Sequence, residues 1–398
     1  MEIETILAFA NSVQDPRKRP TRVTYSASMI LTTTLLAVLA GCREWEEMAD
    51  FAELQIDLIK KFYPEVKTTP SPDTFSRFFS LLKPKKFERA FRIWVAKYFP
   101  RPKGDYCIDG KAMRGAAKYD PKYKDSNDPY PVDMVSLWSV ENGISFGQIQ
   151  VSEKSNEITA IPKLLSLVCL AGCVVSIDAM GCQKKIADAI LKAEGDFLLA
   201  LKDNQEYLCT TAKSFFENMQ ENLEQSPEAK EWYYTDVSEN KDHGRIEKRE
   251  VIAFGQPGGG DYFDHELQAA QHWVGIKSFV RVQSTVTTLS TGKTTTEFRY
   301  YLTSLKADNV KRIATSIRNH WSIENQLHWQ LDVSFGEDDS KRIGNAALNM
   351  SVINKTALSI LKRYKETTNC KKSMKSLMRR ACMNSSLLLE ILDKAVWN

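Results

Sequence analysis

The sequence predicts an α/β fold in which a mixed β-sheet is flanked by helices. Up to residue 98 the apolar residues recur at helical spacing, and from residue 105 short apolar runs typical of strands replace them. The dipeptide Asn142-Gly143 separates two of these runs, which is a strong signal for a hairpin. Predicted helices and strands then alternate up to residue 201, and this order favours a mixed sheet with helices on its faces.

The predicted order of elements is that of the ribonuclease-H-like fold. In that fold one aspartate lies on the first strand and a second lies at the end of the fourth strand. Asp109 and Asp178 occupy these two places. The strands are expected at residues 106–109, 134–140, 144–151, 173–178 and 196–201, with helices at 157–170 and 183–193.

Three regions are expected along the chain. Residues 1–103 form a helical N-terminal domain, which ends near a proline-rich and glycine-containing stretch. Residues 104–340 form the ribonuclease-H-like domain, interrupted by a largely β insertion at about 205–303, and residues 341–398 form a helical, basic C-terminal region. Basic residues recur in the N-terminal domain, so it is either a DNA-binding module or a domain with an ordinary solvated face.

The composition describes an ordinary globular protein. The chain has 398 residues, a net charge of +4, 43% hydrophobic residues and 26% charged residues. Its eight cysteines include no Cys-x-x-Cys pair, which favours reduced, buried thiols in the cytosol. The beginning of the chain lacks the pattern of a signal peptide, and the apolar run at 29–41 is too short to span a membrane. We expect a cytoplasmic protein that does not associate with membranes.

A third acidic residue, Glu324, lies on a predicted helix that is rich in tryptophan and histidine. Together with Asp109 and Asp178 it would complete a set of hard oxygen ligands, which Mg²⁺ prefers. Such a set fits phosphoryl transfer, in which two metal ions about 4 Å apart activate the attacking oxygen and stabilise the leaving oxygen. The expected cofactor is therefore Mg²⁺, with Mn²⁺ as a substitute.

Two alternatives concern the same helix. His320, Glu324 and His328 recur every fourth residue, so on a regular α-helix they would form one stripe that could bind Zn²⁺. The plainer alternative is that the histidines form hydrogen bonds while Trp321 and Trp329 pack in the core. Asp332, Glu337 and Asp338 are alternative sources of the third carboxylate.

Basic residues flank each of the predicted acidic positions. Positive charge next to a carboxylate cluster suits an anionic polymer held across a metal site, although any single lysine is more often a solvated surface residue. The residues that we expect to contact nucleic acid are Lys111, Arg114, Lys184, Arg245, Arg318, His320 and His328.

At these motifs the chain resembles bacterial insertion-sequence DDE transposases of the H-repeat-associated (ISAs-type) family. The resemblance covers nearly the whole chain. Its segments include Ile108-Asp109-Gly110-Lys111, Asp178-Ala179-Met180, His243-Gly244-Arg245-Ile246-Glu247, His320-Trp321 with Ile323-Glu324-Asn325, and Leu327-His328-Trp329.

The resemblance implies a DNA transposase with Asp109, Asp178 and Glu324 as its catalytic triad. Such an enzyme would bind the terminal inverted repeats of its element, hydrolyse phosphodiester bonds with Mg²⁺ and join the ends to target DNA. It would act as a homodimer on double-stranded DNA in the nucleoid. The alternatives are a domesticated nuclease that no longer transposes and a catalytically silent DNA-binding protein.

The chain departs from the usual pattern around the glutamate. Related DDE transposases often carry Tyr, Arg and Lys there, where this chain has Ile317, His320 and Leu331. Arg318, His320 or His328 would have to take over the DNA contacts of those residues.

Overall fold

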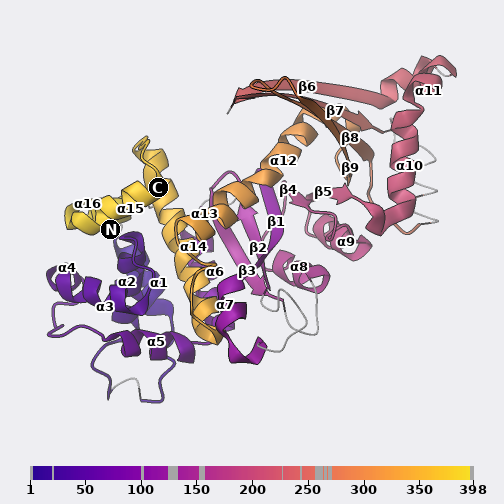
Figure 1. Ribbon diagram of the computed structural model, residues 1–398. Coiled ribbons are helices and arrows are strands. Elements are labelled where there is room, and N and C mark those ends of the chain that lie inside the picture. Colours follow the sequence, from indigo (N-terminus) through magenta and orange to yellow (C-terminus); the bar gives the residue numbers. More distant parts are fainter. Residues whose placement is uncertain are drawn as a thin grey trace. The chain divides into compact units, whose positions relative to one another are not determined.

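The computed structural model describes residues 3–19, 22–99, 103–123, 133–151, 157–225, 227–242, 244–255, 263, 267 and 271–394 (Figure 1). The chain folds into two compact units. The helical unit comprises Met1–Pro102, Gly110–Lys154 and Ile323–Asn398, and the sheet unit comprises Lys103–Asp109 and Ser155–Ser322. The chain therefore crosses between the units four times, and two of these crossings lie directly after Asp109 and directly before Ile323.

The helical unit is built around the long helix α14 (Gly344–Thr367). This helix contacts α2, α5 and α6, and nearly all of its residues up to Leu361 are buried. Helix α2 (Ala27–Leu39) begins after Ser26, which caps it by accepting a hydrogen bond from the Met29 amide at 3.1 Å. The next two helices, α3 (Trp45–Leu54) and α4 (Ile56–Lys60), meet at Gln55.

In chain order, the helices of this unit are α1 Ile3–Ser12, α2 Ala27–Leu39, α3 Trp45–Leu54, α4 Ile56–Lys60, α5 Pro72–Leu81, α6 Pro84–Tyr98, α7 Arg114–Tyr119, η2 Pro121–Tyr123, η7 Ile323–His328, α13 Trp329–Val333, α14 Gly344–Thr367, α15 Met374–Met383 and α16 Ser385–Asp393. The boundaries predicted for the three regions of the chain, after residues 103 and 340, stay a prediction.

The strands form one mixed sheet in the order β3-β2-β1-β4-β5-β9-β8-β7-β6. Strand β1 runs through the crossing between the units that follows Asp109, and β1, β4 and β5 are parallel to one another. The predicted hairpin is confirmed, since β2 and β3 pair antiparallel and Gly143 has the positive φ of +63° that such a turn needs. The strands are β1 Asp105–Ala112, β2 Asp133–Ser139, β3 Ile144–Gln150, β4 Val174–Ile177, β5 Asp196–Leu201, β6 Tyr233–Asp242, β7 Arg245–Phe254, β8 Ser278–Thr288 and β9 Thr294–Thr303.

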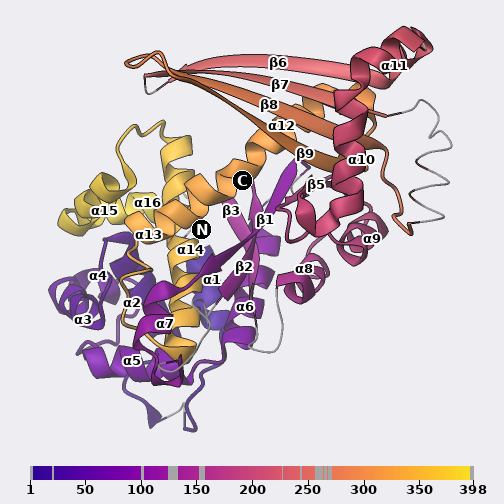
Figure 2. The same cartoon turned by 45° about the vertical axis from the view of Figure 1, so that its right-hand side comes forward.

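The predicted β insertion extends the central sheet. Strand β9 pairs antiparallel with β5, and β8, β7 and β6 follow outward as antiparallel neighbours. The insertion also contains helices α10 (Glu206–Glu217) and α11 (Met219–Gln225). Phe216 of α10 packs against Tyr300 of β9, with ring centroids 6.2 Å apart, and so covers one face of these strands (Figure 2).

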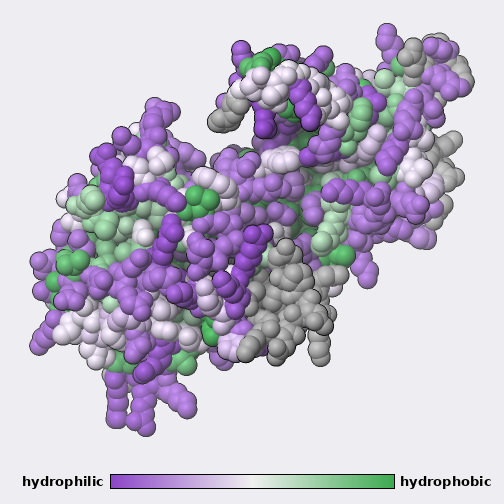
Figure 3. Space-filling view, in the orientation of Figure 1, coloured by the Kyte–Doolittle hydropathy of each residue, from purple (hydrophilic) through white to green (hydrophobic). Residues whose placement is uncertain are grey.

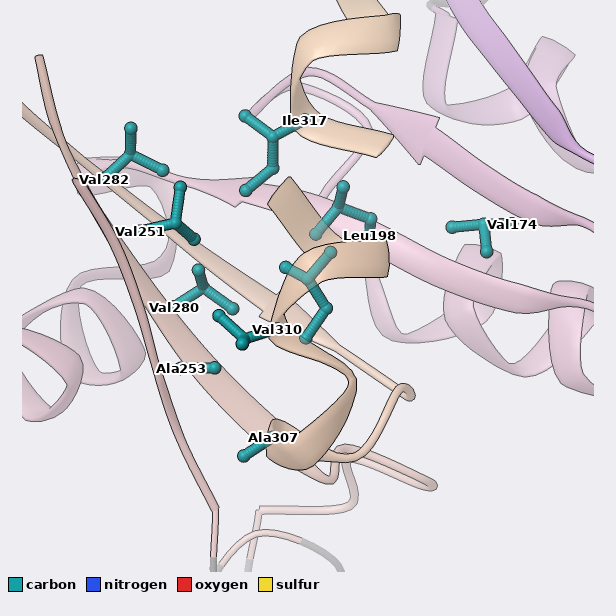
Figure 4. Close-up of a cluster of buried hydrophobic side chains, with 10 residues drawn as sticks. Val174, Leu198, Val251, Ala253, Val280, Val282, Ala307, Val310 and Ile317 are labelled. Carbon is teal, nitrogen blue, oxygen red and sulfur yellow. The ribbon is translucent and has the colours of Figure 1, made fainter. Parts of the chain in front are cut away.

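The opposite face of the same strands is covered by α12 (Val310–Ser322). Ile313 and Ile317 of this helix pack with Val251 of β7 and Val280 of β8 in a cluster of fully buried side chains (Figure 4). The cluster continues to Val174 and Leu198 of the central strands. The remaining elements of the sheet unit are α8 Glu157–Leu165, α9 Lys184–Lys192, η3 Asp203–Gln205, η4 Pro227–Trp232 and η6 Ala307–Asn309.

The face of the protein seen in Figure 3 is largely hydrophilic, with hydrophobic residues gathered in small patches. Of the helices in the described part of the chain, none combines the length and the hydrophobicity needed to cross a membrane.

Candidate active site

Two of the predicted acidic residues directly follow the last paired residues of β1 and β4, two neighbouring parallel strands of the sheet unit. Ile108 of β1 pairs with Ile177 of β4, and Asp109 and Asp178 are the next residues on each strand. Because the two strands are parallel and in register, Asp109 and Asp178 occupy equivalent positions along the two strands. The sequence therefore predicted correctly that β1 and β4 would each carry an aspartate at this edge of the sheet.

The face on which these carboxylates lie follows from the alternation of side chains along a strand. On β1 the Cys107 thiol donates to the backbone oxygen of Asn319 on α12, at 3.3 Å. On β4 the Ser176 hydroxyl lies 3.0 Å from Nδ1 of His320, also on α12. Asp109 and Asp178, each two residues further along, belong to the face of the sheet that α12 covers.

The surroundings of Asp178 disfavour its charged form. The side chain is half-buried, and this burial is the largest cause of the raised pKa of Asp178, to which the negative charge of Asp109 adds. A hydrogen bond from the Gly181 amide to Oδ1 (3.2 Å) and the charges of His320 and Lys202 offset part of this rise in pKa. An aspartate whose charged form is disfavoured by burial and by a neighbouring carboxylate suits a bound cation.

Helix α12 is fixed to β1 by a buried acidic residue that the sequence analysis did not single out. Asp105 is 3% exposed, and its carboxylate accepts hydrogen bonds from Arg312 (2.9 Å), Ser316 (2.7 Å) and Asn319 (2.6 Å). The three donors recur at helical spacing on one side of α12. The spacing of the three donors can be seen in the sequence, but the sequence does not show that Asp105 is the residue that accepts their hydrogen bonds.

Glu324 lies on a π-helix, η7 (Ile323–His328), which follows α12 directly and continues into α13. The side chain of Glu324 is exposed, while the neighbouring Ile323 and Leu327 are fully buried. π-Helical turns inside α-helices occur frequently at functional sites. Glu324 belongs to the helical unit, whereas Asp109 and Asp178 belong to the sheet unit, so the third carboxylate stays a prediction.

The zinc alternative depended on a regular α-helix through residues 320–328. Since residues 323–328 adopt the wider π-helix, His320, Glu324 and His328 do not keep the spacing of one α-helical stripe. His320 instead lies against Ser176. Among the residues that the structure describes, no three His, Cys, Asp or Glu side chains are grouped so as to hold a metal ion.

The three alternative carboxylates all pair with Lys111. Its Nζ lies 2.7 Å from Asp332, 3.3 Å from Glu337 and 3.2 Å from Asp338. Lys111 was expected to contact nucleic acid, but it is only 9% exposed, so it presents almost no surface to a phosphate group. The contact of Lys111 with nucleic acid stays a prediction, and its burial among carboxylates makes it a weaker candidate than an exposed cation.

The other predicted DNA-contacting residues differ in exposure. Arg114, Lys184, Arg245 and Arg318 are exposed, whereas His320 and His328 are half-buried. At the two remaining positions where related transposases often carry Tyr and Lys, this chain has Ile317 and Leu331, which are 3% and 0% exposed. Both residues are part of the core, which explains why hydrophobic side chains occupy these positions.

The strand order β3-β2-β1-β4-β5, with an aspartate directly after the last paired residue of β1 and of β4, defines a ribonuclease-H-like domain. Residues 100–360 match the family described as "Transposase DDE domain", and residues 7–95 match the accompanying "DDE_Tnp_1-associated" family. The chain therefore belongs to the DDE transposase family, as its motifs predicted, and it is a DNA transposase.

Relatives match along nearly the whole chain. The "H repeat-associated putative transposase YhhI" of Escherichia coli (strain K12) is 34% identical over 98% of this chain and 98% of its own length. The "Putative transposase YncI" of Escherichia coli O157:H7 is 34% identical over 98% of this chain and 95% of its own length. The solved structure titled "Cryo-EM structure of piggyBac transposase synaptic complex with hairpin DNA (SNHP)" aligns with a TM-score of 0.49 at 11% identity, over 99% of this chain and 81% of that chain.

Proposed function

We propose that Asp109, Asp178 and Glu324 form the catalytic triad of this transposase and that they bind Mg²⁺, or Mn²⁺ as a substitute. The observation that carries the proposal is the pairing of Ile108 with Ile177, which brings two aspartates to one level on neighbouring strands. The acidic, half-buried surroundings of Asp178 fit a hard divalent cation, which would relieve the repulsion between the two carboxylates.

The residues around Asp178 would prepare the site for this ion. The Gly181 amide holds Oδ1 of Asp178, so the carboxylate keeps one orientation. Ser176 holds the ring of His320 on the same face of the sheet. The chemistry that a bound divalent ion supplies is neutralisation of the phosphate oxygens and activation of the attacking oxygen.

We further propose that the substrates are the terminal inverted repeats of the element and the target DNA. The exposed residues Arg114, Lys184, Arg245 and Arg318 are the cations that we assign to the DNA backbone, with His320 and His328 nearer to the triad. The enzyme would act as a homodimer that bridges two element ends in the nucleoid. The helical region 1–103 would assist in binding the ends, and 104–340 would carry the chemistry.

The test is cleavage of labelled element-end DNA with Mg²⁺ by wild type, Asp109→Asn, Asp178→Asn and Glu324→Gln. Each variant should cut about 1,000-fold more slowly, because metal ions supply several kcal/mol of transition-state stabilisation. All three should still bind the DNA. Asp203→Asn is the matched control, since Asp203 is an exposed aspartate of the sheet unit and its variant should cut like wild type.

Two outcomes would contradict the assignment. If all three variants cut as fast as wild type, these carboxylates are not the triad. If Glu324→Gln stays active while Glu337→Gln is inactive, Asp109 and Asp178 can remain but the third carboxylate has been placed on the wrong residue.

A further inference from the structure

We propose that Lys111 is a positioning residue of the transposase, which fixes the helix that carries Glu324 to the end of the strand that carries Asp109. The inference rests on the proposed triad. It assigns a role in the reaction to a lysine that is buried among three carboxylates of the helical unit.

The position of Lys111 in the chain is the first argument. Lys111 lies two residues beyond Asp109 on β1, in the part of the strand that belongs to the helical unit. Its shortest contact, 2.7 Å, is to Asp332 on α13, the α-helical turn that directly continues the π-helix of Glu324. One ammonium group therefore joins the strand of the first aspartate to the helix of the glutamate.

The second argument is the charge of the cluster formed by Lys111, Asp332, Glu337 and Asp338. The Lys111 ammonium lies within 3.3 Å of all three carboxylates, so it is the cation shared by the cluster. Glu337 is 6% exposed, and burial would raise its pKa, yet Lys111 and Lys355 lower it. Without Lys111, three carboxylates would repel one another in a poorly solvated place, and the segment 332–338 would have to move apart.

The third argument is the close packing of the chain around this cluster. A Cβ atom on Gly115, near the start of α7, would lie 2.4 Å from the Ser340 oxygen and 2.8 Å from the Asp338 oxygen. The Arg43 guanidinium donates to the backbone oxygens of Val333 (3.2 Å) and Ser334 (2.9 Å). Backbone contacts thus hold the segment, and Lys111 supplies the positive charge that pairs with its carboxylates.

The test compares Lys111→Met with Lys111→Arg in single-turnover cleavage of element-end DNA. Lys111→Met removes the charge and keeps an unbranched side chain, and it should slow cleavage by about 100-fold, the effect of a misplacement on the order of 1 Å. It should also raise the Mg²⁺ concentration for half-maximal cleavage while leaving the DNA affinity unchanged. Lys111→Arg keeps the charge. It should recover most of the cleavage rate, with the Mg²⁺ concentration for half-maximal cleavage equal to that of wild type.

A second variant separates positioning from folding. Lys111→Met combined with Glu337→Gln removes both charges of the most buried pair, so its thermal midpoint should recover relative to Lys111→Met alone. If Lys111 positions the helix of Glu324, cleavage by this double variant stays slow even though the protein is stable. If cleavage recovers together with the thermal midpoint, Lys111 serves stability alone and the proposal is overturned.

The remaining outcomes are also distinct. Lys111→Met could instead weaken DNA binding and reduce the slope of log affinity against log salt concentration by about one. Lys111 would then contact a phosphate group, and the proposal would be wrong. Asp109→Asn measured in parallel keeps this test separate from that of the triad. Wild-type cleavage by Asp109→Asn would refute the proposed function, whereas wild-type cleavage and Mg²⁺ demand in a folded Lys111→Met would refute only the role of Lys111.

Discussion

Replacing Asp105 by alanine should loosen helix α12 without touching any residue of the proposed triad. The Asp105 carboxylate is buried on β1, and it accepts hydrogen bonds from Arg312, Ser316 and Asn319 of α12. In Asp105→Ala all three donors lose this acceptor. Ser316 is fully buried, and its other neighbour, Arg312 Nη1 at 3.0 Å, is itself a donor. The Ser316 hydroxyl proton would therefore lose the acceptor that Asp105 provides.

The magnitude follows from the burial of the partners. Removing one partner of a buried ion pair destabilises a protein by about 3–5 kcal/mol. The Arg312 side chain is 35% exposed, so water compensates part of its loss, and we expect a value of about 3 kcal/mol. Asp105→Asn keeps an acceptor of the same shape and should lose about 1–2 kcal/mol.

Amide hydrogen exchange measured by mass spectrometry is the suitable assay, because a chain of two units need not unfold in one step. A loss of about 3 kcal/mol corresponds to roughly 100-fold faster exchange in peptides from α12. Peptides from α14 in the helical unit are the internal reference, and Asp203→Asn is the control variant. Unchanged exchange of α12 in Asp105→Ala would refute the idea that Asp105 holds this helix.

Two further predictions concern the carboxylate site and the packing around it. Burial and the charge of Asp109 raise the pKa of Asp178, so the stability linked to its protonation is present at low pH and lost as pH rises through the folded-state pKa. Asp178→Asn should therefore raise the thermal midpoint near neutral pH in EDTA, and added Mg²⁺ should stabilise wild type more than the variant; a lower midpoint would contradict this. Gly115→Ala should destabilise the protein by about 1–3 kcal/mol, because the added methyl group would overlap the backbone oxygens of Asp338 and Ser340. An unchanged midpoint in thermal denaturation would contradict this prediction, because it would show that the backbone at 338–340 can move away at little cost.

The sequence was a good guide to the strands because their signals are local. The runs that become β1, β4 and β5 are short and apolar, and the Asn142-Gly143 turn fixes the hairpin between β2 and β3. The order of the elements then placed Asp109 and Asp178 on neighbouring strands. The pairing of β9 with β5 was not visible, because the register between strands about a hundred residues apart depends on packing that no local pattern encodes.

The histidine stripe shows why helical spacing alone misled. Residues 310–333 carry a periodic apolar pattern that is read as one α-helix, but residues 323–328 form a π-helix. In the structure Ile323 and Leu327 are buried and Leu331 continues the buried side on α13. The extra width of the π-helix is set by these tertiary contacts, so the sequence could predict the presence of the helix but not the direction in which Glu324 points.

Lys111 shows the same limit for a charged residue. In the sequence it is a lysine beside an acidic residue of a transposase motif, and a DNA contact is the natural interpretation. Its three carboxylate partners lie more than two hundred residues further along the chain, so only the fold reveals that its charge is already balanced. A buried cation with several anionic partners has little energy to gain from a phosphate, because it would first have to give up these partners. The charge of Lys111 is therefore already engaged by carboxylates of the protein itself, which is the observation behind the positioning role that we propose for it.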